Sequence, residues 1–108
     1  MADLRQQIEQ LAASYGGVVS VSVRNVSNAF DFSLNPEARV IAGSTIKVPI
    51  LIEALRQVKT GQLSLSTEYA IRGGKSCGGS GVIRHLSDGI IFSVQDLLTL
   101  MIIVSDNT

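Results

Sequence analysis

Two short motifs hold residues that could carry out acyl-transfer chemistry. Ser44 stands three residues before Lys47, and Ser105 stands two residues before Asn107. A serine hydroxyl becomes a good nucleophile only when a base takes its proton. Residues three apart on a helix share one face, with Cβ atoms about 5–6 Å apart, and a lysine there can act as that base when burial or a nearby cation disfavours its charged form. The spacing therefore predicts a serine nucleophile with a lysine as its base.

Each motif alone has a plainer interpretation. Ser44 could be only a helix N-cap and Lys47 a solvated side chain, since this spacing often arises by chance. The segment from Ser105 to Asn107 could be only a helix C-cap, a position that asparagine suits. Both motifs, however, lie at ends of apolar helical segments, and this favours the catalytic interpretation. At a helix N-terminus, the free backbone N–H of Ser44 could also hold an oxyanion.

The hydrophobic pattern predicts the elements that precede and carry the first motif. Helical spacing over residues 4–15 predicts an amphipathic helix, and alternation over residues 19–23 and 30–34 predicts two strands. We therefore expect a helix packed on a hairpin. A second helix, buried on most sides, should span residues 44–61, with a distortion at Pro49 because proline has no N–H.

The second motif follows a further helix. Residues 63–89 are rich in glycine and mixed in character, which predicts loops and short helical turns. Ser93 and Asp96 have the spacing of a capping box, with Asp in place of Glu. The helix behind it, residues 94–104, is apolar nearly all round and should be buried in a core.

Composition excludes several classes of function. The 108 residues amount to one domain at most, 45% are hydrophobic, and the net charge is zero with no basic stripe, so nucleic acid is not an expected partner. With only one histidine, His85, and one cysteine, Cys77, no disulfide within the chain and no usual zinc site are possible, and we expect no metal or cofactor. No apolar stretch approaches the roughly 20 residues of a membrane span. The first residues lack the regions of a signal peptide.

Three weaker candidates are set aside. His85 has the features of a packing or surface histidine, and Cys77 those of a loop thiol, because no Cys-His pattern supports catalysis. Residues 73–76 end like a phosphate-binding loop, but position 69 is a tyrosine where that motif needs its first glycine.

The two motifs resemble the signature of the penicillin-recognising serine hydrolases, and the chain is most similar to class A β-lactamases. The string from Arg84 to Gly89, followed by an apolar helix into the second motif, resembles the same family. The resemblance implies an α+β fold, in which an antiparallel sheet flanked by helices joins an all-helical lobe. The chain would be the N-terminal part of one such domain. Residues 1–34 would form a helix and hairpin of the sheet lobe, and residues 44–108 the part of the helical lobe with both motifs.

The resemblance also implies a role for each residue. Ser44 would attack the amide carbonyl of a β-lactam, and its backbone N–H would donate to the oxyanion. Lys47 would hold or take the proton of Ser44, and Ser105 would relay a proton to the leaving ring nitrogen. Asn107 would bind the acylamino side chain of the substrate and hydrogen-bond near Lys47. Asp106 would be structural and tie down the loop through backbone hydrogen bonds.

Two motifs of the family do not follow Asn107 in this sequence. One is the Lys-Thr-Gly strand that holds the substrate carboxylate, and the other is the loop whose Glu activates the deacylating water. We therefore expect the chain to be a fragment that cannot turn over substrate by itself. A complementary C-terminal fragment or a strand-exchanged second copy should cover the apolar edge of residues 18–23.

Other functions on the same fold stay open. The alternatives are a penicillin-binding peptidase or esterase and a catalytically silent binding module. The substrate would be a β-lactam or a small peptidoglycan-like molecule. The resemblance implies a periplasmic or secreted protein, although no signal peptide is present in the sequence.

Overall fold

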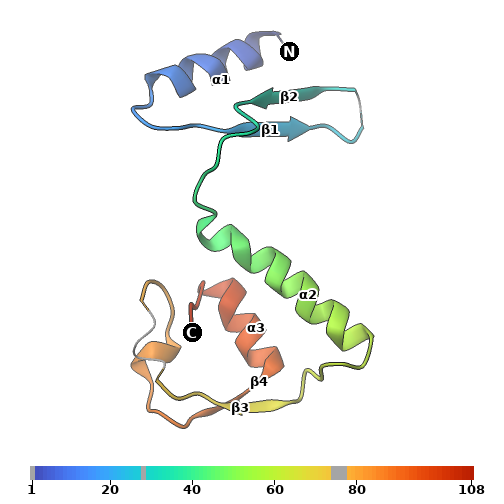
Figure 1. Cartoon of the computed structure of the whole chain (residues 1–108), viewed down its shortest axis with the longest axis vertical. Coiled ribbons are helices and arrows are strands. Elements are labelled where there is room, and N and C mark those ends of the chain that lie inside the picture. Colours follow the sequence, from blue (N-terminus) through green and yellow to red (C-terminus); the bar gives the residue numbers. More distant parts are fainter. Residues whose placement is uncertain (1, 28, 74–77) are drawn as a thin grey trace. The chain divides into compact units, whose positions relative to one another are not determined.

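The polypeptide divides into two units, Met1–Ile41 and Ala42–Thr108 (Figure 1). The computed structural model describes residues 2–27, 29–73 and 78–108. Both motifs lie in the second unit, so its own elements position the candidate site.

The first unit holds helix α1 (Ala2–Ser14) and an antiparallel pair of strands, β1 (Val21–Arg24) and β2 (Asp31–Leu34). The predicted helix and hairpin are therefore confirmed. Phe32 is the main core side chain of this unit, with an exposed fraction of 2%. The guanidinium of Arg5 on α1 lies over its ring, 4.9 Å from the ring centroid. A cation over an aromatic face adds electrostatic attraction to the contact between helix and hairpin.

The helix that carries the first motif begins as a tighter turn. The 3₁₀-helix η1 (Gly43–Ile46) leads directly into α2 (Lys47–Lys59). A distortion at Pro49 was predicted, and the irregular turn lies just before it. Pro49 has no N–H with which to bond the carbonyl of Thr45 in α-helical geometry. The first turn instead uses shorter-range bonds, in which the N–H of Lys47 bonds the carbonyl of Ser44.

One strand of an antiparallel pair lies where the sequence predicted only loops and short helical turns. Strand β3 (Glu68–Ala70) pairs antiparallel with β4 (Ile91–Ser93). The prediction for residues 63–89 was thus wrong in part, although η3 (Ile83–His85) is a short helical turn of the expected kind. Strands of three residues are too short to show a period of two, and the partner lies about 20 residues away, so no local pattern reveals the pairing.

Helix α3 (Val94–Ile103) follows β4 directly and leads to the second motif. The predicted capping box is confirmed. The hydroxyl of Ser93 accepts a hydrogen bond from the N–H of Asp96 at 3.1 Å, and the carboxylate of Asp96 accepts one from the N–H of Ser93 at 3.1 Å. The reciprocal cap fixes where α3 begins, and Ser105 follows the C-cap Val104 at the other end of this helix.

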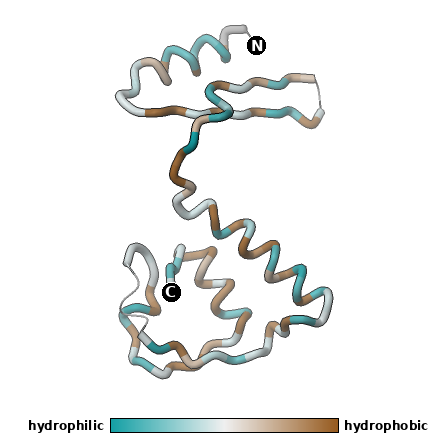
Figure 2. Tube along the Cα trace, viewed as in Figure 1, coloured by the Kyte–Doolittle hydropathy of each residue, from teal (hydrophilic) through white to brown (hydrophobic). Residues whose placement is uncertain are grey.

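Helices α2 and α3 are more exposed than their sequences predicted. They contact each other, and hydrophobic residues recur along both (Figure 2). Leu51 of α2 and Leu98 of α3 line an open apolar groove. Ile52 is 62% exposed and Ile103 69% exposed, so the predictions of a helix buried on most sides over residues 44–61 and of a core helix over residues 94–104 were wrong. An apolar pattern shows which faces avoid water but not what covers them. Among the described residues, no helix is both long and apolar enough to cross a lipid bilayer.

Candidate active site

The amine of Lys47 is buried within a set of three acceptors. Its Nζ donates to the carbonyl oxygen of Ser105 at 2.5 Å, to Ser105 Oγ at 2.9 Å and to Asn107 Oδ1 at 2.6 Å. Lys47 is only 8% exposed, although it stands at the start of α2. Three acceptors match the three N–H donors of an ammonium group, so burial costs this side chain no hydrogen bond.

Ser44 reaches Lys47 through Ser105. Ser44 lies on the exposed turn η1, and its Oγ is 2.7 Å from Ser105 Oγ. Sequence spacing predicted that Ser44 and Lys47 share one helix face, with the lysine as the base. In the described part of the chain, the hydroxyl of Ser105 lies within hydrogen-bond distance of both. A continuous line of polar atoms therefore runs from Ser44 Oγ to Lys47 Nζ, with each step within hydrogen-bond distance.

The backbone N–H of Ser44 lies at the N-terminal turn. Of its neighbours, Thr45 N–H bonds the carbonyl of Ala42 at 3.2 Å, and Lys47 N–H bonds the carbonyl of Ser44. In the described residues, no acceptor bonds the Ser44 N–H, as is usual for the first donors of a helix. An anionic oxygen beside Ser44 Oγ could accept from it.

Ser105 has an unusual backbone conformation. Its φ is +56°, in the left-handed region that disfavours residues with a Cβ. Helix α3 ends just before it, and the N–H groups of Val104 and Asp106 both return to the carbonyl of Leu100. Glycine is the usual residue at such a helix end. Glycine would lack the hydroxyl that contacts both Ser44 and Lys47, and strain of this kind is characteristic of functional sites.

Asp106 fixes the loop that holds the second motif. Its carboxylate is 6% exposed and accepts from the N–H groups of Val82 at 2.6 Å, Ile83 at 2.9 Å and Thr108 at 2.9 Å. Burial raises the pKa of this carboxyl group, but the backbone hydrogen bonds outweigh it, so the pKa lies below its ordinary value. A Cβ on Gly81 would overlap the carboxylate. The close approach of the chain to Asp106 thus requires glycine at this position.

Replacing Asp106 by asparagine is expected to lower the free energy of unfolding by about 3 kcal/mol at pH 7, because an amide turns an N–H group toward other N–H donors. The depressed pKa in the folded state stabilises the protein above the unfolded pKa of about 3.9, and this contribution is lost as pH falls through the folded pKa. Urea unfolding of wild type and Asp106→Asn at pH 7 and pH 3 should show a smaller difference in unfolding free energy at pH 3. An equal difference at both pH values would count against this account.

Asn107 is held at both ends of its amide. Oδ1 accepts from Lys47, whereas Nδ2 donates to the carbonyl of Gly78 at 2.9 Å. Its backbone N–H donates to the carbonyl of Ser80 at 3.0 Å. Only this orientation of the amide puts oxygen toward a donor and nitrogen toward an acceptor. The contacts with Gly78 and Ser80 were not predicted, because backbone carbonyls leave no signal in the residue types.

A literal Lys-Thr-Gly also occurs in the chain, at Lys59, Thr60 and Gly61. It ends α2 rather than forming a strand. Thr60 is the C-cap, and its hydroxyl donates to carbonyls of the last turn, while Gly61 has a φ of +73°. These residues are therefore explained by helix termination.

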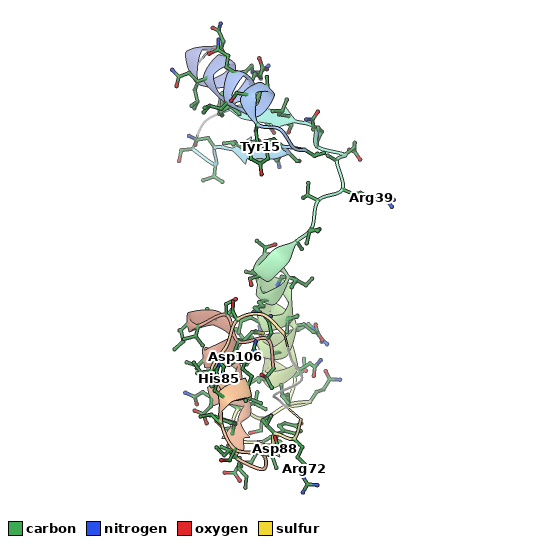
Figure 3. The ribbon with its side chains drawn as sticks, turned by 90° about the vertical axis from the view of Figure 1, so that its left-hand side faces the viewer. Tyr15, Arg39, Arg72, His85, Asp88 and Asp106 are labelled. Carbon is green, nitrogen blue, oxygen red and sulfur yellow. The ribbon has the colours of Figure 1, made fainter. Side chains whose placement is uncertain are left out.

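Other polar side chains that could act as a base lie outside this cluster. His85 is exposed on η3 (Figure 3). Glu53 is exposed on α2, and its hydrogen bonds from Arg56 and Gln57 lower its pKa to about 2, which makes it a poor base. Cys77 and the loop thiol interpretation lie outside the described residues, as does the phosphate-loop resemblance of residues 74–76. Within the described residues, no group of three His, Cys, Asp or Glu side chains could hold a metal ion.

The chain is similar to known proteins in both sequence and fold. Its sequence matches the model of the beta-lactamase enzyme family over residues 3–108. Its fold is similar to a beta-lactamase from Sphaerobacter thermophilus, with 31% identity and a TM-score of 0.85 over 98% of this chain and 39% of that chain. It is also similar to PBP-A and to a PBP-A mutant in an acyl-enzyme complex with penicillin G, each with 24% identity and a TM-score of 0.87 over 99% of this chain and 41% of that chain.

These matches confirm the predicted α+β, β-lactamase-like fold. The chain spans about two fifths of the length of the solved structures. No curated protein sequence matches it.

Proposed function

The chain belongs to the beta-lactamase enzyme family, and from this premise we propose that its site opens β-lactam amides through an acyl-enzyme on Ser44. One observation carries the proposal. The hydroxyl of Ser105 lies 2.7 Å from Ser44 Oγ and 2.9 Å from the buried amine of Lys47. Ser44 as nucleophile, Ser105 as proton relay and Lys47 as proton acceptor would thus follow one another in space, which is the arrangement that serine acyl transfer needs.

Lys47 would act in its neutral form, which has two N–H donors and one lone pair. The carbonyl of Ser105 and Oδ1 of Asn107 can only accept, so they take the two donors. The lone pair would then face the hydroxyl of Ser105, which is the only one of the three described partners of Nζ that can donate. Ser44 passes its proton to Ser105 Oγ while Ser105 passes its own to Lys47.

Acylation of Ser44 then needs no reagent other than the lactam. Ser44 Oγ bonds to the carbonyl carbon of the lactam, and the developing oxyanion accepts from the Ser44 N–H. The C–N bond breaks as Ser105 gives a proton to the ring nitrogen, and Lys47 returns its proton to Ser105. The proton of Ser44 ends on the ring nitrogen, and the product is an ester on Ser44.

Asn107 would recognise the substrate's acylamino side chain. The Nδ2 group has two N–H donors, and the carbonyl of Gly78 takes one of them. The second donor could bind the acylamino carbonyl while Oδ1 stays on Lys47. A mutant of PBP-A, a neighbour in fold, is in an acyl-enzyme complex with penicillin G, and we extend that class of substrate to this chain as part of the proposal.

Hydrolysis of the ester needs a base that activates water, and we propose that residues 1–108 do not supply one. The class A interpretation requires a glutamate beyond the motifs described above, whereas a penicillin-binding peptidase would hold the ester longer. We therefore propose that the chain by itself forms the acyl-enzyme at most and does not turn over.

Mass spectrometry of the full-length protein after exposure to benzylpenicillin tests the proposal, because residues 1–108 by themselves are not expected to release the acyl group. A β-lactamase should show an adduct on the peptide with Ser44 that decays over time, and the Ser44→Ala variant should show none. A persistent adduct would replace the β-lactamase assignment with a penicillin-binding one. Absence of any adduct would overturn the proposal in favour of a silent binding module.

A further inference from the structure

Three successive backbone carbonyls form a cradle beside Asn107. The carbonyls of Gly78 and Ser80 accept from Asn107 Nδ2 and from the Asn107 N–H, at 2.9 Å and 3.0 Å. The carbonyl between them, on Gly79, accepts from Arg84 Nη1 at 2.8 Å. One short segment, residues 78–80, is therefore fixed on one side by Asn107 and on the other by Arg84. We call this segment the carbonyl cradle.

The cradle meets Asn107 with backbone alone. Gly79 has a φ of +82°, and a Cβ at this position would overlap Nδ2 of Asn107. Asn107 is an exposed residue, so packing does not hold its amide in place. Its orientation depends on two hydrogen bonds, one from Lys47 and one to Gly78. Any shift of the cradle would therefore reach the amide directly.

Arg84 is well placed to hold the cradle. It lies on η3, whose first residue Ile83 donates its N–H to the buried carboxylate of Asp106 at 2.9 Å. Arg84 is itself half-buried. A hydrogen bond from a guanidinium is charge-assisted and stronger than a neutral one. A series of contacts thus runs from Asp106 through η3 and the cradle to Asn107, and the side chain of Arg84 joins η3 to the cradle.

We propose that Arg84 is a positioning residue for Asn107 and tunes recognition of substrates that carry an acylamino group. The inference rests on the proposed function of Asn107. Arg84 touches neither Ser44 nor Lys47 among the described contacts. Its loss should therefore weaken acylation by a substrate that uses Asn107 and spare one that does not.

The test compares Arg84→Met with Arg72→Met. Arg72 is exposed and lies at the far end of the second unit from Asp106 (Figure 3), so its variant removes the same charge without touching the cradle. With benzylpenicillin, Arg84→Met should acylate about tenfold more slowly, the change expected from about 1.4 kcal/mol of lost positioning. Penicillanic acid, which lacks the acylamino group, should react within about twofold of wild type. Arg84→Lys, which keeps a charged donor, should restore part of the rate.

Two further measurements keep the test decisive. In an Asn107→Ala background, Arg84→Met should cause no additional loss, because residues that act as a unit are not additive. The Asn107 side-chain amide signals in NMR spectra should shift in Arg84→Met and not in Arg72→Met. This readout needs no substrate, so it tests the contact even if wild type forms no adduct and the proposed function fails. Unchanged amide signals, or equal loss with both substrates, would overturn the inference.

Discussion

Replacement of Lys47 by methionine is expected to slow acylation of Ser44 by about 10²–10⁴-fold, the usual contribution of a positioned base. Methionine keeps an unbranched side chain but offers no lone pair to the hydroxyl of Ser105. It also removes the donor from the Ser105 carbonyl and from Asn107 Oδ1. The rate can be followed by mass spectrometry of the adduct with benzylpenicillin over time.

A second variant separates the positive charge of Lys47 from its proton chemistry. Lys47→Arg keeps the charge and the donors, but a guanidinium does not release its proton in proteins. We expect Lys47→Arg to acylate as slowly as Lys47→Met and to resist urea better. Leaving the acceptors without donors should lower the unfolding free energy of Lys47→Met by about 1–3 kcal/mol. Acylation of Lys47→Arg at the wild-type rate would exclude Lys47 as the base.

The polar residues of the site could be identified from sequence because their signals are local. The spacing of Ser44 and Lys47 is set by one helical turn, and the cap at Ser93 places the helix that leads to Ser105. In the structure, Ser105 Oγ lies within hydrogen-bond distance of Ser44 Oγ and Lys47 Nζ, and Asn107 Oδ1 accepts from Lys47 Nζ. Their roles in the reaction stay predictions until acylation is measured.

The parts that were missed depend on contacts between distant segments. The line from Ser44 to Lys47 passes through Ser105, 61 residues away from Ser44, and no spacing rule fixes that geometry. The hydrogen bond from Asn107 to Gly78 is accepted by a backbone carbonyl, a group that every residue type has. Glycine at position 79 signals only that a side chain is absent, and the reason appears once Asn107 lies against it.

The exposure of α2 and α3 was missed for a different reason. Both helices have apolar residues on most faces, and such residues favour burial, which is why the sequence predicted it. Within the described chain, only part of that surface is covered, and an open groove remains between Leu51 and Leu98. Periodicity reports the preference of a face and not the identity of its cover.

The second large effect concerns Ser105, where catalysis and stability should separate. Both Ser105→Ala and Ser105→Gly remove the hydroxyl between Ser44 and Lys47, so both should slow acylation by about 10²–10⁴-fold. They should differ in stability, because φ at this position is +56°. Alanine keeps the Cβ that disfavours this conformation, whereas glycine does not. We expect the free energy of unfolding of Ser105→Gly to be about 1 kcal/mol higher than that of Ser105→Ala.

Urea unfolding of the two variants, together with acylation by benzylpenicillin, distinguishes the two roles of Ser105. If the variants are equally stable, the backbone at Ser105 stores no strain and the serine needs no functional reason. If either variant acylates at the wild-type rate, the relay is wrong and Ser44 must reach Lys47 directly. Slow acylation in both with the glycine variant more stable would mean that the site keeps a strained serine because its hydroxyl joins the nucleophile to the base.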